Sequence, residues 1–134
     1  MSRVRAIAPI VCTLVTAGCG GSIPHPHWVA QPTSALVEVP YPPPAARPEG
    51  VPAQPAESAV WIDGEWRWRR RRWSWRSGRW VTPPPGAAFS PWTSVRRSDG
   101  VVFFAPGVWR DARGQPLDDP PPLALAAATA AALE

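Results

Sequence analysis

The sequence contains no lysine, and its only two cysteines, Cys12 and Cys19, lie near the N-terminus. All fourteen positive charges are therefore arginine. Residues 59–117 lack histidine as well as cysteine, and no acidic residue lies between positions 66 and 98. These absences exclude disulfide bonds in that segment and leave it without a nucleophile–base pair or a set of metal ligands. We therefore expect no enzymatic activity, no cofactor and no metal.

The first eighteen residues have the features of an export signal. Two arginines precede an apolar run over residues 6–15, which is shorter than the ~20 residues that a membrane-spanning helix needs. Small residues at 16–18 then lead to Cys19, and this pattern resembles a bacterial lipobox, with Thr16 in the place that leucine usually takes. The resemblance implies cleavage before Cys19 and attachment of lipid to Cys19.

Lipidation also accounts for an otherwise unexplained cysteine. Cys12 would leave with the signal, so Cys19 would remain without a partner in an exported chain. Residues 20–22 are Gly, Gly and Ser, without the aspartate that marks retention in the inner membrane of enteric bacteria. The resemblance therefore implies a lipid anchor in the outer membrane, and it leaves open which side the protein faces.

Proline divides the remaining chain into three parts. It fills residues 40–55, so the segment 19–58 is expected to be the lipidated cysteine followed by an extended, disordered tether, in which residues 35–39 are compatible with a short strand. Residues 59–117 form the expected folded module. The alanine-rich tail, 118–134, is compatible with a short helix, and whether it docks on the module stays open.

Three segments of the module share the spacing aromatic-x-x-Gly-x-Trp: WIDGEW (61–66), WRSGRW (75–80) and FAPGVW (104–109). Asp-Gly is a strong signal for a two-residue hairpin turn, and Ser-Gly fits the same position. We therefore expect Gly64, Gly78 and Gly107 to be turn glycines. In that case the two aromatic residues of each segment face each other across a turn.

Tryptophan alternates with arginine or serine on both sides of the run Arg69–Arg72, as expected of half-buried strands. Joining these strands through the run places Trp66 opposite Trp75 and Trp68 opposite Trp73. The sequence thus predicts an all-β fold, a small antiparallel, tryptophan-rich meander of about six short strands.

The two complete segments and the interleaved WRW and WSW resemble the WXXGXW-repeat lipoproteins, small envelope proteins of proteobacteria. The resemblance covers residues 61–82 and, through Phe104, weakly 104–109. It implies an accessory role in the envelope rather than catalysis. The repeat aromatics are Trp61, Trp66, Trp68, Trp73, Trp75, Trp80, Phe104 and Trp109.

Two interpretations remain open for each residue type. The tryptophans form either the core or a platform for sugar rings or a partner protein. The candidate anion contacts Arg69, Arg70, Arg71 and Arg72 are either a solvated tip or a contact for an anionic polysaccharide or lipopolysaccharide, because arginine binds carboxylate and phosphate in bidentate fashion. The modest net charge of +4 argues against nucleic acid. We expect a lipid-anchored envelope protein that binds an anionic polymer or an envelope protein, and the alternative is an accessory lipoprotein without its own ligand.

Overall fold

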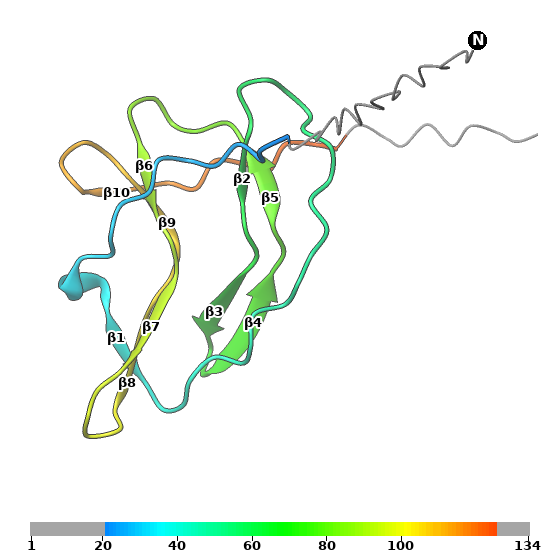
Figure 1. Ribbon diagram of the computed structural model, residues 1–134. Coiled ribbons are helices and arrows are strands. Elements are labelled where there is room, and N and C mark those ends of the chain that lie inside the picture. Colours follow the sequence, from blue (N-terminus) through cyan, green and yellow to red (C-terminus); the bar gives the residue numbers. More distant parts are fainter. Residues whose placement is uncertain (1–20, 126–134) are drawn as a thin grey trace, which may run out of the picture.

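The computed structural model describes residues 21–125, and these residues form antiparallel β-structure without an α-helix (Figure 1). The all-β antiparallel fold class is confirmed. No helix among the described residues is long and apolar enough to cross a membrane. Residues 21–125 contain one 3-10 turn, η1 (Thr33–Ala35), and ten strands: β1 (Val37–Val39), β2 (Val60–Ile62), β3 (Glu65–Arg69), β4 (Arg72–Arg76), β5 (Arg79–Val81), β6 (Ala88–Ser90), β7 (Thr93–Arg96), β8 (Val102–Ala105), β9 (Val108–Arg110) and β10 (Pro116–Leu117).

Residues 60–81 form one long hairpin. Strand β3 pairs with β4 and β2 pairs with β5, and the register is the same in both ladders although residues 63–64 and 77–78 interrupt them. The predicted pairs Trp66–Trp75 and Trp68–Trp73 are confirmed. The turns predicted at Gly64 and Gly78 are wrong, because the chain continues past both glycines and the only reversal is at the arginine run.

The outer tryptophans consequently have different partners from those predicted. Trp61 pairs with Trp80, so it lies opposite neither Trp66 nor any other residue of its own segment. The two tryptophans expected to face each other within each repeat lie along the same strand instead, and the cross-strand pairs are Trp61–Trp80 and Trp66–Trp75, one on each side of the interruption. An Asp-Gly dipeptide between aromatic residues therefore marks an interruption of the ladder here, and the chain keeps its direction.

Residues 88–110 repeat this design. Strand β6 pairs with β9 and β7 with β8 in one register, interrupted at residues 91–92 and 106–107. Phe89 faces Trp109, as Trp61 faces Trp80 in the first hairpin. The prediction that Phe104 lies near Trp109 across a turn at Gly107 is wrong, because Phe104 pairs with Ser94.

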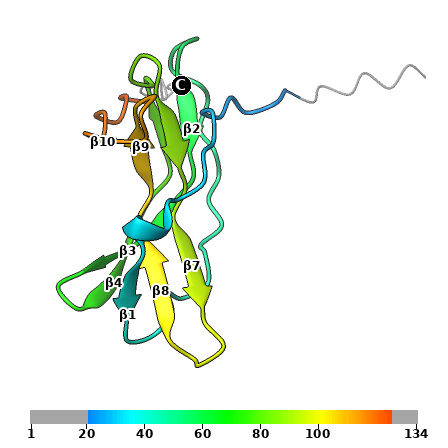
Figure 2. The same ribbon diagram turned by 90° about the vertical axis from the view of Figure 1, so that its left-hand side faces the viewer.

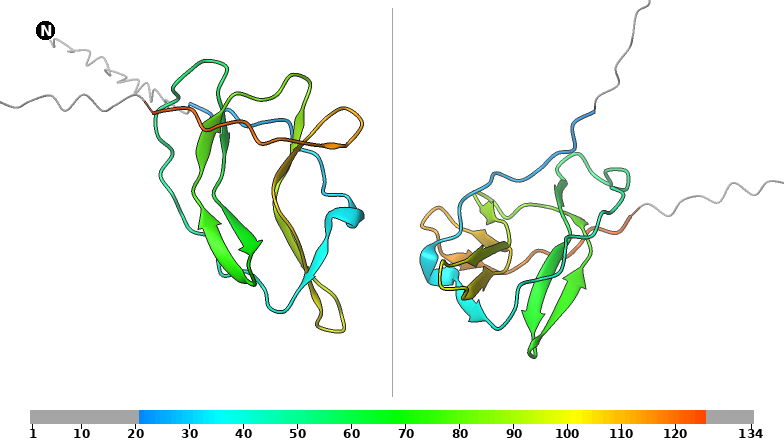
Figure 3. Two further views of the ribbon diagram at one scale, coloured as in Figure 1. Left: turned by 180° about the vertical axis from the view of Figure 1, so that it is seen from behind. Right: turned by 60° about the horizontal axis from the view of Figure 1, so that its bottom comes forward.

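The two hairpins face each other (Figure 3), and two clusters of buried apolar side chains join them. Ile62 and Val81 of the first hairpin pack with Phe89 and Trp109 of the second. Toward the tips, Trp68 and Trp73 pack against a cluster that contains Phe104, and the ring centroids of Trp73 and Phe104 are 4.7 Å apart. The described tryptophans thus supply much of the core, which agrees with the first of the two interpretations of these residues.

The proline-rich segment lies on the hairpins, whereas the sequence suggested a free tether. Strand β1 adds to the edge of β8, which makes the three-stranded sheet β1-β8-β7, and the chain then runs back along the first hairpin (Figure 1). A polyproline segment has carbonyl groups without internal partners. The indole N–H of Trp66 donates to Ala45 O at 3.1 Å, and that of Trp80 donates to Pro52 O at 3.0 Å.

The segment after β10 also lies on the molecule. Strand β10 pairs with β9, and the Leu123 N–H then donates to Trp80 O at 2.8 Å on the first hairpin. We call residues 118–123 the C-terminal strap. The strap contains no helix. Residues 126–134, which carry most of the predicted tail helix, lie outside the described residues.

The repeat glycines are needed for space. None of Gly64, Gly78 and Gly107 has a positive φ angle. A Cβ on Gly64 would lie within 2.9 Å of the Trp75 ring carbons Cζ2 and Cε2, and one on Gly78 would lie equally close to the ring of Trp61. The first tryptophan of each repeat therefore packs on the glycine of the other repeat. Gly107 is crowded too, because such a Cβ would meet the carboxylate of Glu65 first and would lie 2.8 Å from Phe89 Cζ.

We expect Gly64→Ala and Gly78→Ala each to lower the free energy of unfolding by about 2 kcal/mol, because the added methyl must push a core indole aside. For a domain of this size the melting temperature should fall by roughly 8–16 °C. Gly50→Ala is the matched control, since nothing lies within 4 Å of its Cβ position and its stability should hardly change. Equal melting temperatures for the three variants would contradict the packing role.

Candidate functional site

The tryptophan face of the first hairpin is covered by the chain itself. Trp61, Trp66 and Trp80 are each at most 5% exposed. Trp75 is half-buried, the Arg47 guanidinium lies 5.9 Å from its ring centroid, and its indole N–H donates to Glu49 Oε1 at 2.9 Å. These contacts cover most of this face and leave a pocket of about 360 Å³ lined in part by Trp61, Trp75 and Trp92. The burial of Trp61, Trp66 and Trp80 supports the core interpretation of these three tryptophans.

The arginine run forms the tip of the first hairpin. All four side chains, Arg69 to Arg72, are exposed, and among the described residues none of them makes a hydrogen bond or an ion pair. Arg69 pairs with Arg72 in the ladder, so Arg70 and Arg71 alone form the loop. Both have positive φ angles, 50° and 61°, as a type I′ turn requires.

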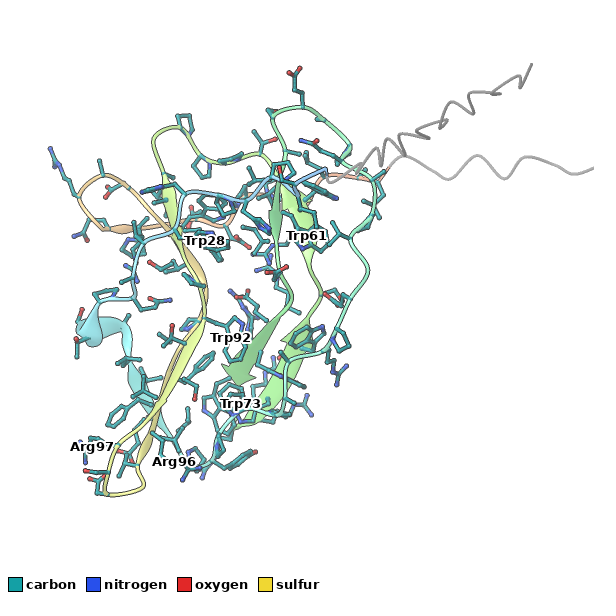
Figure 4. All side chains as sticks on the ribbon, viewed as in Figure 1. Trp28, Trp61, Trp73, Trp92, Arg96 and Arg97 are labelled. Carbon is teal, nitrogen blue, oxygen red and sulfur yellow. The ribbon has the colours of Figure 1, made fainter. Side chains whose placement is uncertain are left out.

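The second hairpin carries arginine near its tip too, which the sequence reasoning missed. Arg96 and Arg97 lie at the lower end of β7–β8, opposite the end that carries Trp28 and Trp61 (Figure 4). Arg97 forms an ion pair with Asp99 and lies 5.3 Å from the Phe103 ring centroid. Figure 2 shows both hairpin tips at the same end of the molecule. The signal was present in the sequence as an Arg-Arg pair just before a hairpin loop.

A cluster of ionised groups lies on the face of β3–β4 opposite the tryptophans. Glu65 is 1% exposed, and its Oε1 lies 3.3 Å from Arg67 Nε and 3.8 Å from both Arg76 Nη1 and Arg79 Nη1. Burial raises the pKa of Glu65, and the neighbouring arginines Arg67, Arg79 and Arg76 oppose this effect. Burial likewise lowers the pKa of Arg79. Alternation along β3 and β4 puts Glu65, Arg67 and Arg76 on one face, but nothing in the sequence indicated that Glu65 is buried there.

A groove of about 490 Å³ follows this face from the cluster toward the tip. Successive residues on one face of a strand are separated by ~7 Å, so the cross-strand pairs Arg67–Ser74 and Arg69–Arg72 form steps of a basic track. The groove is lined by Arg67, Arg69, Ser74, Trp75, Arg76 and Asp119. We call the arginines of this face, together with the tip, the arginine track.

The lipidation site and the question of a metal site are treated differently by the structure. Cys19 lies outside the described residues. Within residues 21–125, no three or more His, Cys, Asp or Glu side chains gather in a way that could hold a metal ion. The arrangement offers exposed guanidinium groups, a groove that leads inward from them, and a buried carboxylate that partly neutralises the inner end.

Comparison with known proteins gives one finding, and it falls on the first hairpin. No curated protein and no solved structure matches the chain. Residues 60–81 match the family model of the WXXGXW repeat in two copies. The matched residues run from the start of β2 to the end of β5, so the repeat pair is one structural unit: a single hairpin whose two strands each carry one copy.

Proposed function

We propose that this chain is a lipid-anchored protein of the bacterial outer membrane whose β module binds an anionic envelope polymer, and that it is not an enzyme. The observation that carries the proposal is the tip formed by Arg70 and Arg71. Four exposed arginines without internal partners supply the positive charge. The groove behind them gives an extended anionic chain a path along the hairpin.

The backbone of the tip supports a role for these side chains beyond solubility. A left-handed conformation costs a residue other than glycine about 1 kcal/mol or more, and Asn-Gly fits a type I′ turn far better than Arg-Arg. Both loop residues nevertheless are arginine. Sparsely populated backbone conformations persist where function requires the residue. Stability alone gives no reason for arginine at these two positions.

We expect the double variant Arg70→Asn/Arg71→Gly to be more stable than the wild type and to bind polyanions less well. Relief of the two strained positions should raise the free energy of unfolding by about 1 kcal/mol. Loss of two exposed charges should lower the salt concentration at which the protein elutes from heparin. Thermal unfolding and heparin chromatography on the same samples measure both effects.

Arg113→Ser is the control for charge away from the tip: it removes one exposed arginine, against two in the tip variant, from the turn between β9 and β10 at the other end of the molecule (Figure 1). It should elute close to the wild type. If the Asn-Gly variant elutes with the wild type, or if no variant is retained at low salt, the arginines are a solvated tip. The alternative of an accessory lipoprotein without its own ligand would then be preferred.

The position of the N-terminal residues supports a short connection to the proposed anchor. The Trp61 N–H donates to Pro24 O at 2.8 Å, so the folded body begins five residues after Cys19. Five residues reach at most ~18 Å. From Trp61 to Arg70 the first hairpin extends up to ~30 Å away from that contact. A lipid on Cys19 would thus hold this end of the body near the membrane, and an upright body would carry the arginine tip up to ~30 Å farther out, where a polymer can reach it.

The anchor itself has a direct test. The wild-type protein should incorporate labelled fatty acid and partition into detergent, and Cys19→Ala should do neither, because lipid on this sulfur is the proposed attachment. Cell fractionation with labelled palmitate measures both. A wild-type protein recovered in the soluble periplasmic fraction without label would contradict the anchor, and it would leave polymer binding to be judged by the tip variants.

A further inference from the structure

The inner end of the arginine track contains more positive charge than its buried carboxylate can balance. Three guanidinium groups, those of Arg67, Arg76 and Arg79, surround the single carboxylate of Glu65. Arg79 is almost fully buried, with 5% of its side chain exposed, and among the described residues its Nε and Nη1 atoms make no hydrogen bond. Buried charges without partners are costly, so this cluster requires a second anion.

Asp119 of the C-terminal strap supplies that anion in the structure. The Arg79 Nη2 donates to both carboxylate oxygens of Asp119, at 3.2 and 3.3 Å, and Arg76 Nη2 forms an ion pair with the same group. The Asp119 side chain is 33% exposed and lines the groove. Two carboxylates, those of Glu65 and Asp119, therefore lie at the inner end of the track, whereas the four arginines of the tip form no ion pair among the described residues.

We propose that this inner end is a carboxylate-binding subsite of the arginine track, and that Asp119 occupies it as an internal competitor until a carboxylate of the bound polymer replaces it. The ligand class is an acidic polysaccharide that carries carboxylates, such as a polyuronate. This inference rests on the proposed function, because it extends the same binding surface inward by one anionic group.

The strap is attached in a way that permits the exchange. Among the described residues, those at 118–122 make no polar contact other than the ion pairs of Asp119. The attachments on either side are β10, which pairs with β9 up to Leu117, and Leu123, whose N–H bonds to Trp80 O. Replacing one carboxylate by another leaves the balance between charge and desolvation of Arg76 and Arg79 almost unchanged. The exchange of one carboxylate for the other would therefore cost little free energy beyond that of detaching the strap.

The test is the variant Asp119→Asn, which removes the negative charge and keeps the shape of the side chain. Its binding is measured with polygalacturonate as the probe. We expect it to bind about 3–10 times more tightly than the wild type, because the competing anion is gone. The slope of the logarithm of the binding constant against the logarithm of the salt concentration should also be steeper by about one, because the pair Arg76 and Arg79 now contacts the polymer. Asp118→Asn, which removes the neighbouring charge, should match the wild type, and Asp119→Glu should restore wild-type affinity and slope.

A second measurement covers the case in which Asp119→Asn lowers the melting temperature. In the wild type, polygalacturonate should accelerate hydrogen exchange at the Leu123 amide, because displacement of Asp119 loosens the strap, and it should leave the Trp61 amide unchanged. Equal affinity and equal salt slope for Asp119→Asn and wild type, or slower exchange at Leu123, would overturn the subsite while polymer binding stands. If neither protein binds polygalacturonate at low salt, the carboxylate subsite is overturned as well, and retention of the wild type on heparin then decides whether the proposed function stands.

Discussion

The contact of a tryptophan ring with a glycine backbone on the facing strand is the constraint on which the first hairpin depends. Trp61 needs the space above Gly78, and Trp75 needs the space above Gly64. Each repeat thus provides the glycine that the other repeat requires, and one copy alone could not form the unit. The reciprocity explains why the spacing occurs twice in residues 60–81 and why both copies lie on one hairpin. It also positions β3 and β4, and with them the arginine tip.

The proline-rich segment is held by the tryptophans of the same hairpin. A buried indole N–H usually finds an acceptor, and three of these tryptophans find theirs on this segment. The segment between β1 and β2 provides acceptors in sequence: Ala45 for Trp66, Glu49 for Trp75 and Pro52 for Trp80. An extended proline-rich chain loses little entropy on binding and has free carbonyl groups, so it suits this role. Its composition favours extended backbone, and the tryptophans determine that it lies on the hairpin.

The part of the fold near the arginine run could be predicted from the sequence, because any short loop at residues 69–72 places Trp66 opposite Trp75. The pairing of Trp61 with Trp80 could not, since a glycine between two aromatic residues serves a turn or a close contact equally well, and the two uses have the same sequence. At the site, the exposed tip was predicted from the lack of nearby acids. Glu65 and Asp119 were not, because their positions depend on how the second hairpin and the strap fold back on the first.

The most direct test of the reciprocal packing is a nuclear Overhauser measurement on the wild-type protein. We expect cross-peaks from the Gly64 Hα protons to the Trp75 ring and from the Gly78 Hα protons to the Trp61 ring, with upfield-shifted glycine signals in both cases. Cross-peaks between the rings of Trp61 and Trp66, with glycine signals at ordinary positions, would show that each repeat closes on itself and would contradict the single hairpin.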